Sequence, residues 1–371
     1  MKHKGWIRIA AIFFGLLFLS GSAFAAESED IRRFSGADEL LDALPEDFNK
    51  EDFAPFFEDG SEGDLWSLIL NKILSYFTLG IREGLSFFLK LCVLILFSAL
   101  FSSMKKSFGI DSLEGVFDFL FILISALLCY STLENSFEVT KNALSTMANF
   151  LTVSISVMTI LLGMTGGVGS AAVLHANIRF VLAFFTQGIA KVIFPVLKAL
   201  FGFSLVTSFT ETGLGGIFHF FKKTVRNVCV FFFTVISALL ALQHALASAS
   251  DSLSMRSVRF AAGNFIPVVG SFVGESAKTL AASFSLVKTQ CGVVSLIVLL
   301  FLVLQPILYI WVQKMFLSLG KALSEMLGDS KGTGFLNGIA SLMDLLLALL
   351  ISQGCYFVFF ITLFLNHKGS I

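Results

Sequence analysis

Long apolar runs separated by short polar segments make up the chain from Leu65 onward. Six of these runs have about twenty residues each, the length that an α-helix needs to cross the ~30 Å hydrocarbon core of a bilayer. We therefore predict transmembrane helices over Gly84–Met104, Gly115–Leu133, Asn142–Gly163, Val225–Ser248, Cys291–Val312 and Leu342–Leu365. This pattern predicts an all-α, polytopic helical membrane protein.

A seventh apolar region, Asn177–Val206, is too long for a simple span. As a single helix it would measure about 45 Å at ~1.5 Å per residue, which exceeds the bilayer core. It is either one tilted span or a tight helical pair, with Lys191, Pro195 and Lys198 marking a kink or a turn. The chain is therefore expected to have about seven transmembrane helices, within a range of six to eight.

The first residues have the three parts of a secretory signal in order. Lys2, Lys4 and Arg8 form a positive region, Ile9–Leu19 is apolar, and Ala23-Phe24-Ala25 is a small-x-small cleavage site. We predict that residues 1–25 are a cleavable signal peptide and that the mature N-terminus is extracytoplasmic. The alternative is an uncleaved first transmembrane helix, for which eleven apolar residues are short.

An acidic segment, residues 26–64, follows the signal. Residues 27–64 contain fourteen acidic and three basic residues, a net charge of −11, although the whole chain has a formal charge of zero. The segment is expected to lie outside the cytoplasm, either as short amphipathic helices or as a tether. Residues 65–371 then form the multi-span helical membrane domain.

Composition narrows the possible functions. Hydrophobic residues make up 56% of the chain and charged residues only 14%, with 44 phenylalanines. That mixture excludes a soluble enzyme, a nucleic-acid binder and a disordered scaffold. The chain has no phosphate-binding loop, dinucleotide fingerprint or zinc-protease motif, and its five cysteines are isolated. We therefore expect no enzymatic activity, no cofactor and no metal.

Two stretches between the predicted spans are unusual. The first consists mainly of small residues and includes Thr165, Gly166, Gly167 and Ser170, which permit close backbone approach. A flexible loop is the alternative interpretation of this stretch.

The second stretch, Asp251–Gln290, is too polar to span cleanly and too apolar for an ordinary loop. Its centre is a run broken by proline and flanked by glycines, which indicates a re-entrant or broken helix packed inside the protein. An amphipathic helix at the membrane interface is the alternative. The residues of this candidate structural or conduit motif are Gly263, Asn264, Phe265, Ile266, Pro267 and Gly270.

Ionisable residues inside the predicted spans are further candidates, because such groups are costly in a membrane and usually face the bundle interior. A pair between Lys90 and Asp118 on neighbouring helices is one hypothesis, with snorkelling of the lysine as the alternative. The complete set of candidate intramembrane charges is Lys90, Asp118, Lys191, Lys198 and Asp344.

The chain resembles the stage III sporulation protein AE family in two stretches, Thr165-Gly166-Gly167 with Ser170-Ala171-Ala172 and His175, and Arg259-Phe260 with Gly263-Asn264-Phe265-Ile266-Pro267-Val268 and Gly270. The signal, the polar outer segment and the multi-span body match the layout of that family. The resemblance implies a multi-pass protein of the mother-cell membrane that surrounds the forespore. It would belong to a secretion-like channel complex required for endospore development and late forespore gene expression.

The implied partners are other stage III A-series proteins, including a secretion-type ATPase and ring-forming proteins, and indirectly the forespore stage II sporulation protein Q. A self-contained secondary transporter or permease for a small solute is the alternative function. No clear internal repeat relates the two halves of the body, which disfavours a transporter built from inverted repeats.

Overall fold

The structure is a computed structural model that describes residues 62–108, 114–164, 168–183, 188, 191–209, 214–265 and 269–366. These described residues form helices and short turns and contain no strand. The helices are α5 (Glu62–Phe108), α6 (Glu114–Met164), α7 (Val168–Ala183), α8 (Phe194–Phe209), α9 (Leu214–Phe265), α10 (Val269–Met326) and α11 (Ser330–Asn366). The predicted all-α class is confirmed. The predicted signal peptide and most of the acidic segment lie outside the described residues.

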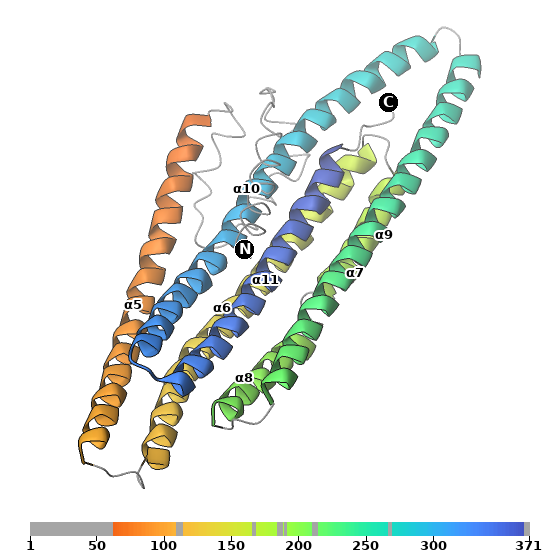
Figure 1. The fold of residues 1–371 in the computed structure, drawn as a ribbon. Coiled ribbons are helices and arrows are strands. Elements are labelled where there is room, and N and C mark those ends of the chain that lie inside the picture. The colour runs from red at the N-terminus through yellow and green to blue at the C-terminus, as the bar shows by residue number, and fades with distance from the viewer. Residues whose placement is uncertain are drawn as a thin grey trace.

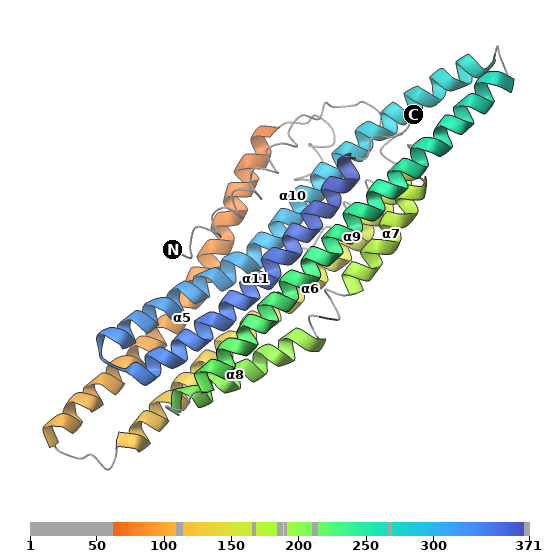
Figure 2. The same cartoon turned by 45° about the vertical axis from the view of Figure 1, so that its right-hand side comes forward.

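The helices form an elongated bundle with roughly aligned axes (Figure 1, Figure 2). α10 packs against α11, α5 and α6, and α11 also packs against α6 and α8. α7 lies between α6 and α9. The core consists of apolar side chains such as Leu91, Leu151, Leu299 and Leu346, each fully buried.

A tight turn joins the two central helices, α10 and α11. Gly328 has a φ of +80°, the left-handed conformation that commonly ends a helix, and its N–H donates to the carbonyl of Glu325. Asp329 then caps α11, because its Oδ1 accepts a 2.8 Å hydrogen bond from the N–H of Gly332. The glycine-aspartate pair therefore fixes α10 and α11 as antiparallel neighbours.

Four helices within the described residues are long and apolar enough to cross a membrane, and their apolar stretches are Ile73–Leu100, Phe119–Met164, Cys291–Met326 and Lys331–Thr362. The membrane character of the chain agrees with the sequence prediction. The predicted count of seven spans is not confirmed.

One difference lies in α6, a single 51-residue helix that contains both predicted spans Gly115–Leu133 and Asn142–Gly163. The polar residues between them include no proline or glycine. The hydroxyls of Ser136 and Thr140 donate to carbonyls four residues earlier, at 2.9 and 2.7 Å. These hydroxyls are satisfied inside the helix, so polarity here does not indicate a loop.

The region Asn177–Val206 contains residues 184–187 and 189–190, which lie outside the described part, so the choice between a tilted span and a tight helical pair stays a prediction. The described residues of the region lie mainly in α7 and α8, which have 16 residues each. Pro195 is the second residue of α8 and follows the π-helical residues 191–193.

The stretch Asp251–Gln290 contains the predicted break at Pro267, which lies outside the described residues. The described backbone of the stretch belongs to the continuous helices α9 and α10, and residues 266–268 between them lie outside the described part. Figures 1 and 2 show that the C-terminal end of α9 and the N-terminal end of α10 extend beyond the ends of the other helices. The re-entrant or broken helix therefore stays a prediction.

Candidate functional site

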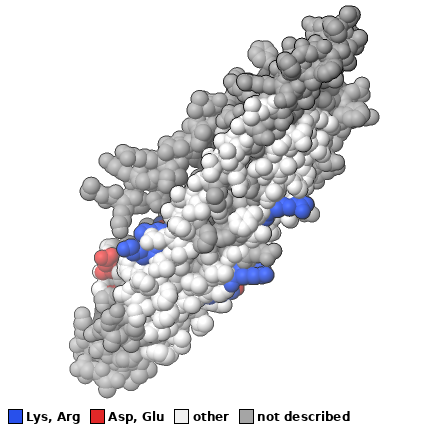
Figure 3. Space-filling model, turned by 90° about the vertical axis from the view of Figure 1, so that its right-hand side faces the viewer, with Lys and Arg blue, Asp and Glu red and all other residues white. Residues whose placement is uncertain are grey.

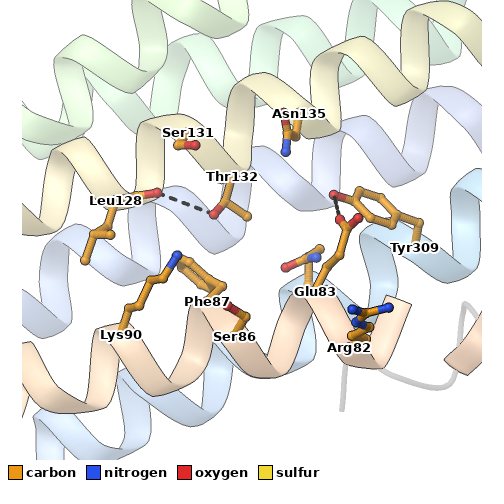
Figure 4. Close-up of a pocket in the computed structure, with 11 residues that line it drawn as sticks. Arg82, Glu83, Ser86, Phe87, Lys90, Leu128, Ser131, Thr132, Asn135 and Tyr309 are labelled. Carbon is orange, nitrogen blue, oxygen red and sulfur yellow. Dashed lines mark hydrogen bonds between the residues drawn. The ribbon is translucent and has the colours of Figure 1, made fainter. Parts of the chain in front are cut away.

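A polar cavity lies between α5, α6 and α10 (Figure 4). Its volume is about 370 Å³, within the range of sites for small molecules. It is lined by Arg82, Glu83, Ser86, Phe87 and Lys90 of α5, Leu128, Ser131, Thr132 and Asn135 of α6, and Tyr309 and Gln313 of α10. Most of these side chains are polar or charged, although each helix is apolar overall.

Helical spacing brings the lining residues together. Glu83, Phe87 and Lys90 recur every three or four residues and therefore share one face of α5. Tyr309 and Gln313 are one turn apart on α10. Ser86 lies at the middle of the apolar stretch Ile73–Leu100, and Tyr309 at the middle of Cys291–Met326. The cavity is thus at the mid-depth of two candidate spans.

One hydrogen bond crosses the cavity. The hydroxyl of Tyr309 donates to Oε2 of Glu83 at 2.9 Å and links α10 to α5 (Figure 4). Gln313, one turn along α10, is only 2% exposed, and its Oε1 has no hydrogen-bond partner. A buried carbonyl oxygen without a partner is costly, so this atom is a candidate ligand contact.

The two basic side chains of the cavity are separated. Lys90 directs its amine toward α6 (Figure 4), and Arg82 is eight residues away, about 12 Å along the helix axis. No ion pair to either side chain occurs within the part of the chain that the structure describes. The cavity therefore contains two basic groups and one acidic group.

Two of the predicted intramembrane charges form ion pairs. Lys198 of α8 contacts Glu134 of α6 at 2.7 Å, and Asp344 of α11 contacts Lys314 of α10. The first pair joins helices that are separated by α7 in the chain, and the second joins the consecutive helices α10 and α11. Figure 3 shows a face that is largely uncharged, with isolated charged side chains among the described residues.

Lys90 and Lys191 have no such partner in the described part. Lys191 is exposed just before α8. The side chain of Asp118 lies outside the described residues. Its position on α6 is ten residues before Leu128, which lines the cavity with Lys90, a separation of about 15 Å along the axis. The predicted Lys90–Asp118 pair stays a prediction.

The described residues of the two stretches that resemble the family, Thr165–His175 and Arg259–Gly270, do not line this cavity. Ser170 is fully buried in α7, and Gly263, Asn264 and Phe265 end α9. Gly270 lies in the first turn of α10. Thr165, Gly166, Gly167, Ile266 and Pro267 lie outside the described residues. Among the residues described, no group of three or more His, Cys, Asp or Glu is arranged to hold a metal ion.

Sequence reasoning missed most of the cavity. It selected Lys90 but placed Arg82 and Glu83 just before a predicted span, and it did not consider Tyr309 or Gln313. The signal that was present is the recurrence of polar residues at helical spacing inside an apolar run, as at Glu83, Ser86 and Lys90.

Comparisons with known proteins agree with the resemblance in the sequence. The family model for stage III sporulation protein AE matches residues 48–367. The chain is similar to the stage III sporulation protein AE of Bacillus subtilis (strain 168), with 22% identity over 239 residues. That alignment covers 64% of this chain and 60% of the relative's length. No solved structure matches the chain.

Proposed function

Because the chain belongs to the stage III sporulation protein AE family, we propose that it is a membrane component of the secretion-like channel complex that links mother cell and forespore. The single observation that carries this proposal is the family match over residues 48–367, which includes every described helix. In this role the protein lies in the mother-cell membrane around the forespore. It is required there for endospore development and late forespore gene expression.

The outer surface of the bundle supports a role inside a membrane assembly. Leu89, Val93 and Phe97 are 56%, 68% and 66% exposed and follow one another at four-residue spacing on α5. This spacing gives α5 an apolar outward stripe. Such a stripe is suited to lipid or to the transmembrane helix of another subunit.

We propose a non-enzymatic role in which partners supply the energy. These partners are other stage III A-series proteins, including a secretion-type ATPase and ring-forming proteins. Contact with stage II sporulation protein Q of the forespore is indirect and runs through the rings. The extracytoplasmic acidic segment is the part of this chain that reaches toward the intermembrane space in this arrangement.

The second stretch that resembles the family, Arg259–Gly270, is the proposed site at which the complex either closes its conduit or lets cargo pass. It joins the ends of α9 and α10, which extend past the rest of the bundle. An Asn264 side chain has both a donor and an acceptor for a partner backbone, and Pro267 restricts the connecting backbone. Substitution of either residue is expected to impair assembly.

The experiment is co-purification of the tagged chain from sporulating cells, followed by identification of the associated proteins. Wild-type protein should recover other stage III A-series proteins, and Asn264→Ala should recover less of them at equal abundance. Asn142→Ala is the matched control, because Asn142 is an exposed asparagine on α6, far in sequence from the two stretches that resemble the family. Recovery of stable wild-type protein without any of these partners would contradict the proposal.

A self-contained transporter for a small solute is the second candidate, and one observation favours it. The polar cavity lies at the mid-depth of two candidate spans, where transporters place substrate sites. Purified protein in sealed vesicles should accumulate solute without partners if this function holds. The channel proposal expects no such uptake by the isolated chain.

A further inference from the structure

Lys90 presents a problem of charge balance. It lies near the middle of the apolar stretch Ile73–Leu100 and lines the cavity between α5, α6 and α10. A lysine at this depth usually pairs with an acidic group or faces water. No ion pair to Lys90 occurs among the described residues.

The acidic residue of the cavity is engaged elsewhere. Glu83 accepts the hydroxyl of Tyr309 at 2.9 Å. It precedes Lys90 by seven residues, about 10 Å along the helix axis. Glu83 and Lys90 also direct their head groups to different parts of the cavity (Figure 4). The lining residues therefore supply no acidic partner to Lys90, which is exposed.

Neutral groups around Lys90 are suited to an oxyanion. Ser131 and Thr132 of α6 lie opposite Lys90, whereas Asn135 lies at the Glu83 end of the cavity (Figure 4). The hydroxyl of Thr132 donates to the carbonyl of Leu128 at 3.4 Å. An ammonium and a hydroxyl are donors whose hydrogen bonds carboxylate and phosphate oxygens accept.

Gln313 offers the cavity a hydrogen-bond acceptor, whereas Lys90 offers a donor. Gln313 lines the cavity and is only 2% exposed, and its buried Oε1 has no hydrogen-bond partner. A bound molecule that only accepts hydrogen bonds would leave this oxygen unsatisfied. A ligand with an O–H or N–H group would satisfy it.

We propose that the cavity between α5, α6 and α10 binds a small organic oxyanion, phosphate or carboxylate, that also carries a hydroxyl or amine donor. The oxyanion is held by Lys90 and the hydroxyl of Ser131, and the donor is directed to Oε1 of Gln313. The volume of about 370 Å³ admits a molecule of this kind. The site lies within one chain, so it goes beyond the channel proposal and does not depend on assembly.

The oxyanion has two sources, a free solute or the head group of a lipid. Three probes distinguish them, all tested on the purified full chain in nanodiscs of zwitterionic lipid. Radiolabelled glycerol 3-phosphate and L-glutamate represent free phosphate and carboxylate solutes. Phosphatidylglycerol mixed into the disc represents the lipid, and its effect is measured as an increase in the thermal unfolding temperature.

At least one probe should bind saturably to the wild type. Lys90→Gln should weaken that binding tenfold or more, since a charge-assisted hydrogen bond contributes about 1.5–3 kcal/mol. Lys90→Arg should retain most of the affinity, because the charge remains. Gln313→Leu should weaken binding while keeping the helix apolar. Lys321→Gln is the matched control and should bind as the wild type does, since Lys321 donates to Asn337 of α11 instead.

Each outcome decides the proposal. Saturable binding of a soluble probe that depends on Lys90 assigns a solute site, and a stabilisation by phosphatidylglycerol that depends on Lys90 assigns a lipid site. Failure of all three probes to bind would overturn the proposal. Equal binding by wild type and Lys90→Gln would also overturn it, and circular dichroism establishes that each variant is folded.

Discussion

Lys198 on α8 donates a 2.7 Å hydrogen bond from its Nζ to Oε1 of Glu134 on α6, across 64 residues of sequence. The contact joins a 16-residue helix to the middle of a 51-residue helix. This contact also explains why polar residues interrupt the apolar pattern of α6, because Glu134 forms an ion pair with α8 and does not belong to a loop.

This pair should contribute modestly to stability. Lys198→Met and Glu134→Gln should each lower the free energy of unfolding, with a coupling of about 0.5–1 kcal/mol in a double-mutant cycle. The effect is small because the two side chains are 45% and 41% exposed. Reversible unfolding in bicelles is the measurement, and Lys191→Met, which removes an exposed lysine nearby, is the control. Strictly additive effects of the two changes would show that the pair is not coupled.

The ion pair between Lys314 and Asp344 should contribute more to the free energy of unfolding than the Lys198–Glu134 pair does. Lys314 is only 26% exposed, and the pair joins the two central helices. Lys314→Met alone should cost about 1–2 kcal/mol, since it leaves a carboxylate without its partner. The double variant with Asp344→Leu should recover part of the loss. Lys321→Gln, which changes a contact to a neutral asparagine on the same helix pair, should cost less. If the double variant unfolds more readily than both single variants, this account of the pair is wrong.

Close packing of α10 against α11 gives a third prediction. A Cβ on Gly354 would lie 2.7 Å from Cγ1 and 3.0 Å from Cγ2 of Val303, closer than side chains tolerate. Gly354→Ala should therefore destabilise the protein by about 1–3 kcal/mol through overpacking.

Gly334 of the same helix is the matched position, because a Cβ added there would meet no neighbouring side chain or helix within 4 Å. Gly334→Ala should be neutral or stabilising by up to about 1 kcal/mol, the gain in helix propensity. Thermal unfolding of both variants in one detergent makes the comparison. Equal unfolding temperatures for the two variants would contradict the packing described for Gly354.

The sequence predicted the helical class and the position of most apolar segments, because hydrophobicity and length determine where a helix can enter a bilayer. It failed at Glu134–Lys141, where polarity suggested a loop. Ser136 and Thr140 satisfy their hydroxyls on the helix itself. A hydropathy pattern contains no information about such internal hydrogen bonds.

The candidate site was predicted only in part for a related reason. Lys198, Asp344 and Lys90 stood out as charges in apolar runs, but their surroundings depend on which helices are neighbours. Glu134 and Lys314 appeared to lie between or beyond spans, and neither Tyr309 nor Gln313 stands out in the sequence. Register between distant helices is set by packing across the whole bundle, and a single sequence does not show it.

The frequency of heat-resistant spores in a strain that lacks this protein tests the central claim most directly. Vegetative growth should be unchanged, and sporulation should stop after engulfment with the defect in the forespore. Expression of the wild-type chain in the mother cell should restore spores, which excludes an effect on neighbouring genes. A deletion strain that forms heat-resistant spores at the normal frequency would contradict the sporulation role and leave the solute transporter as the better account.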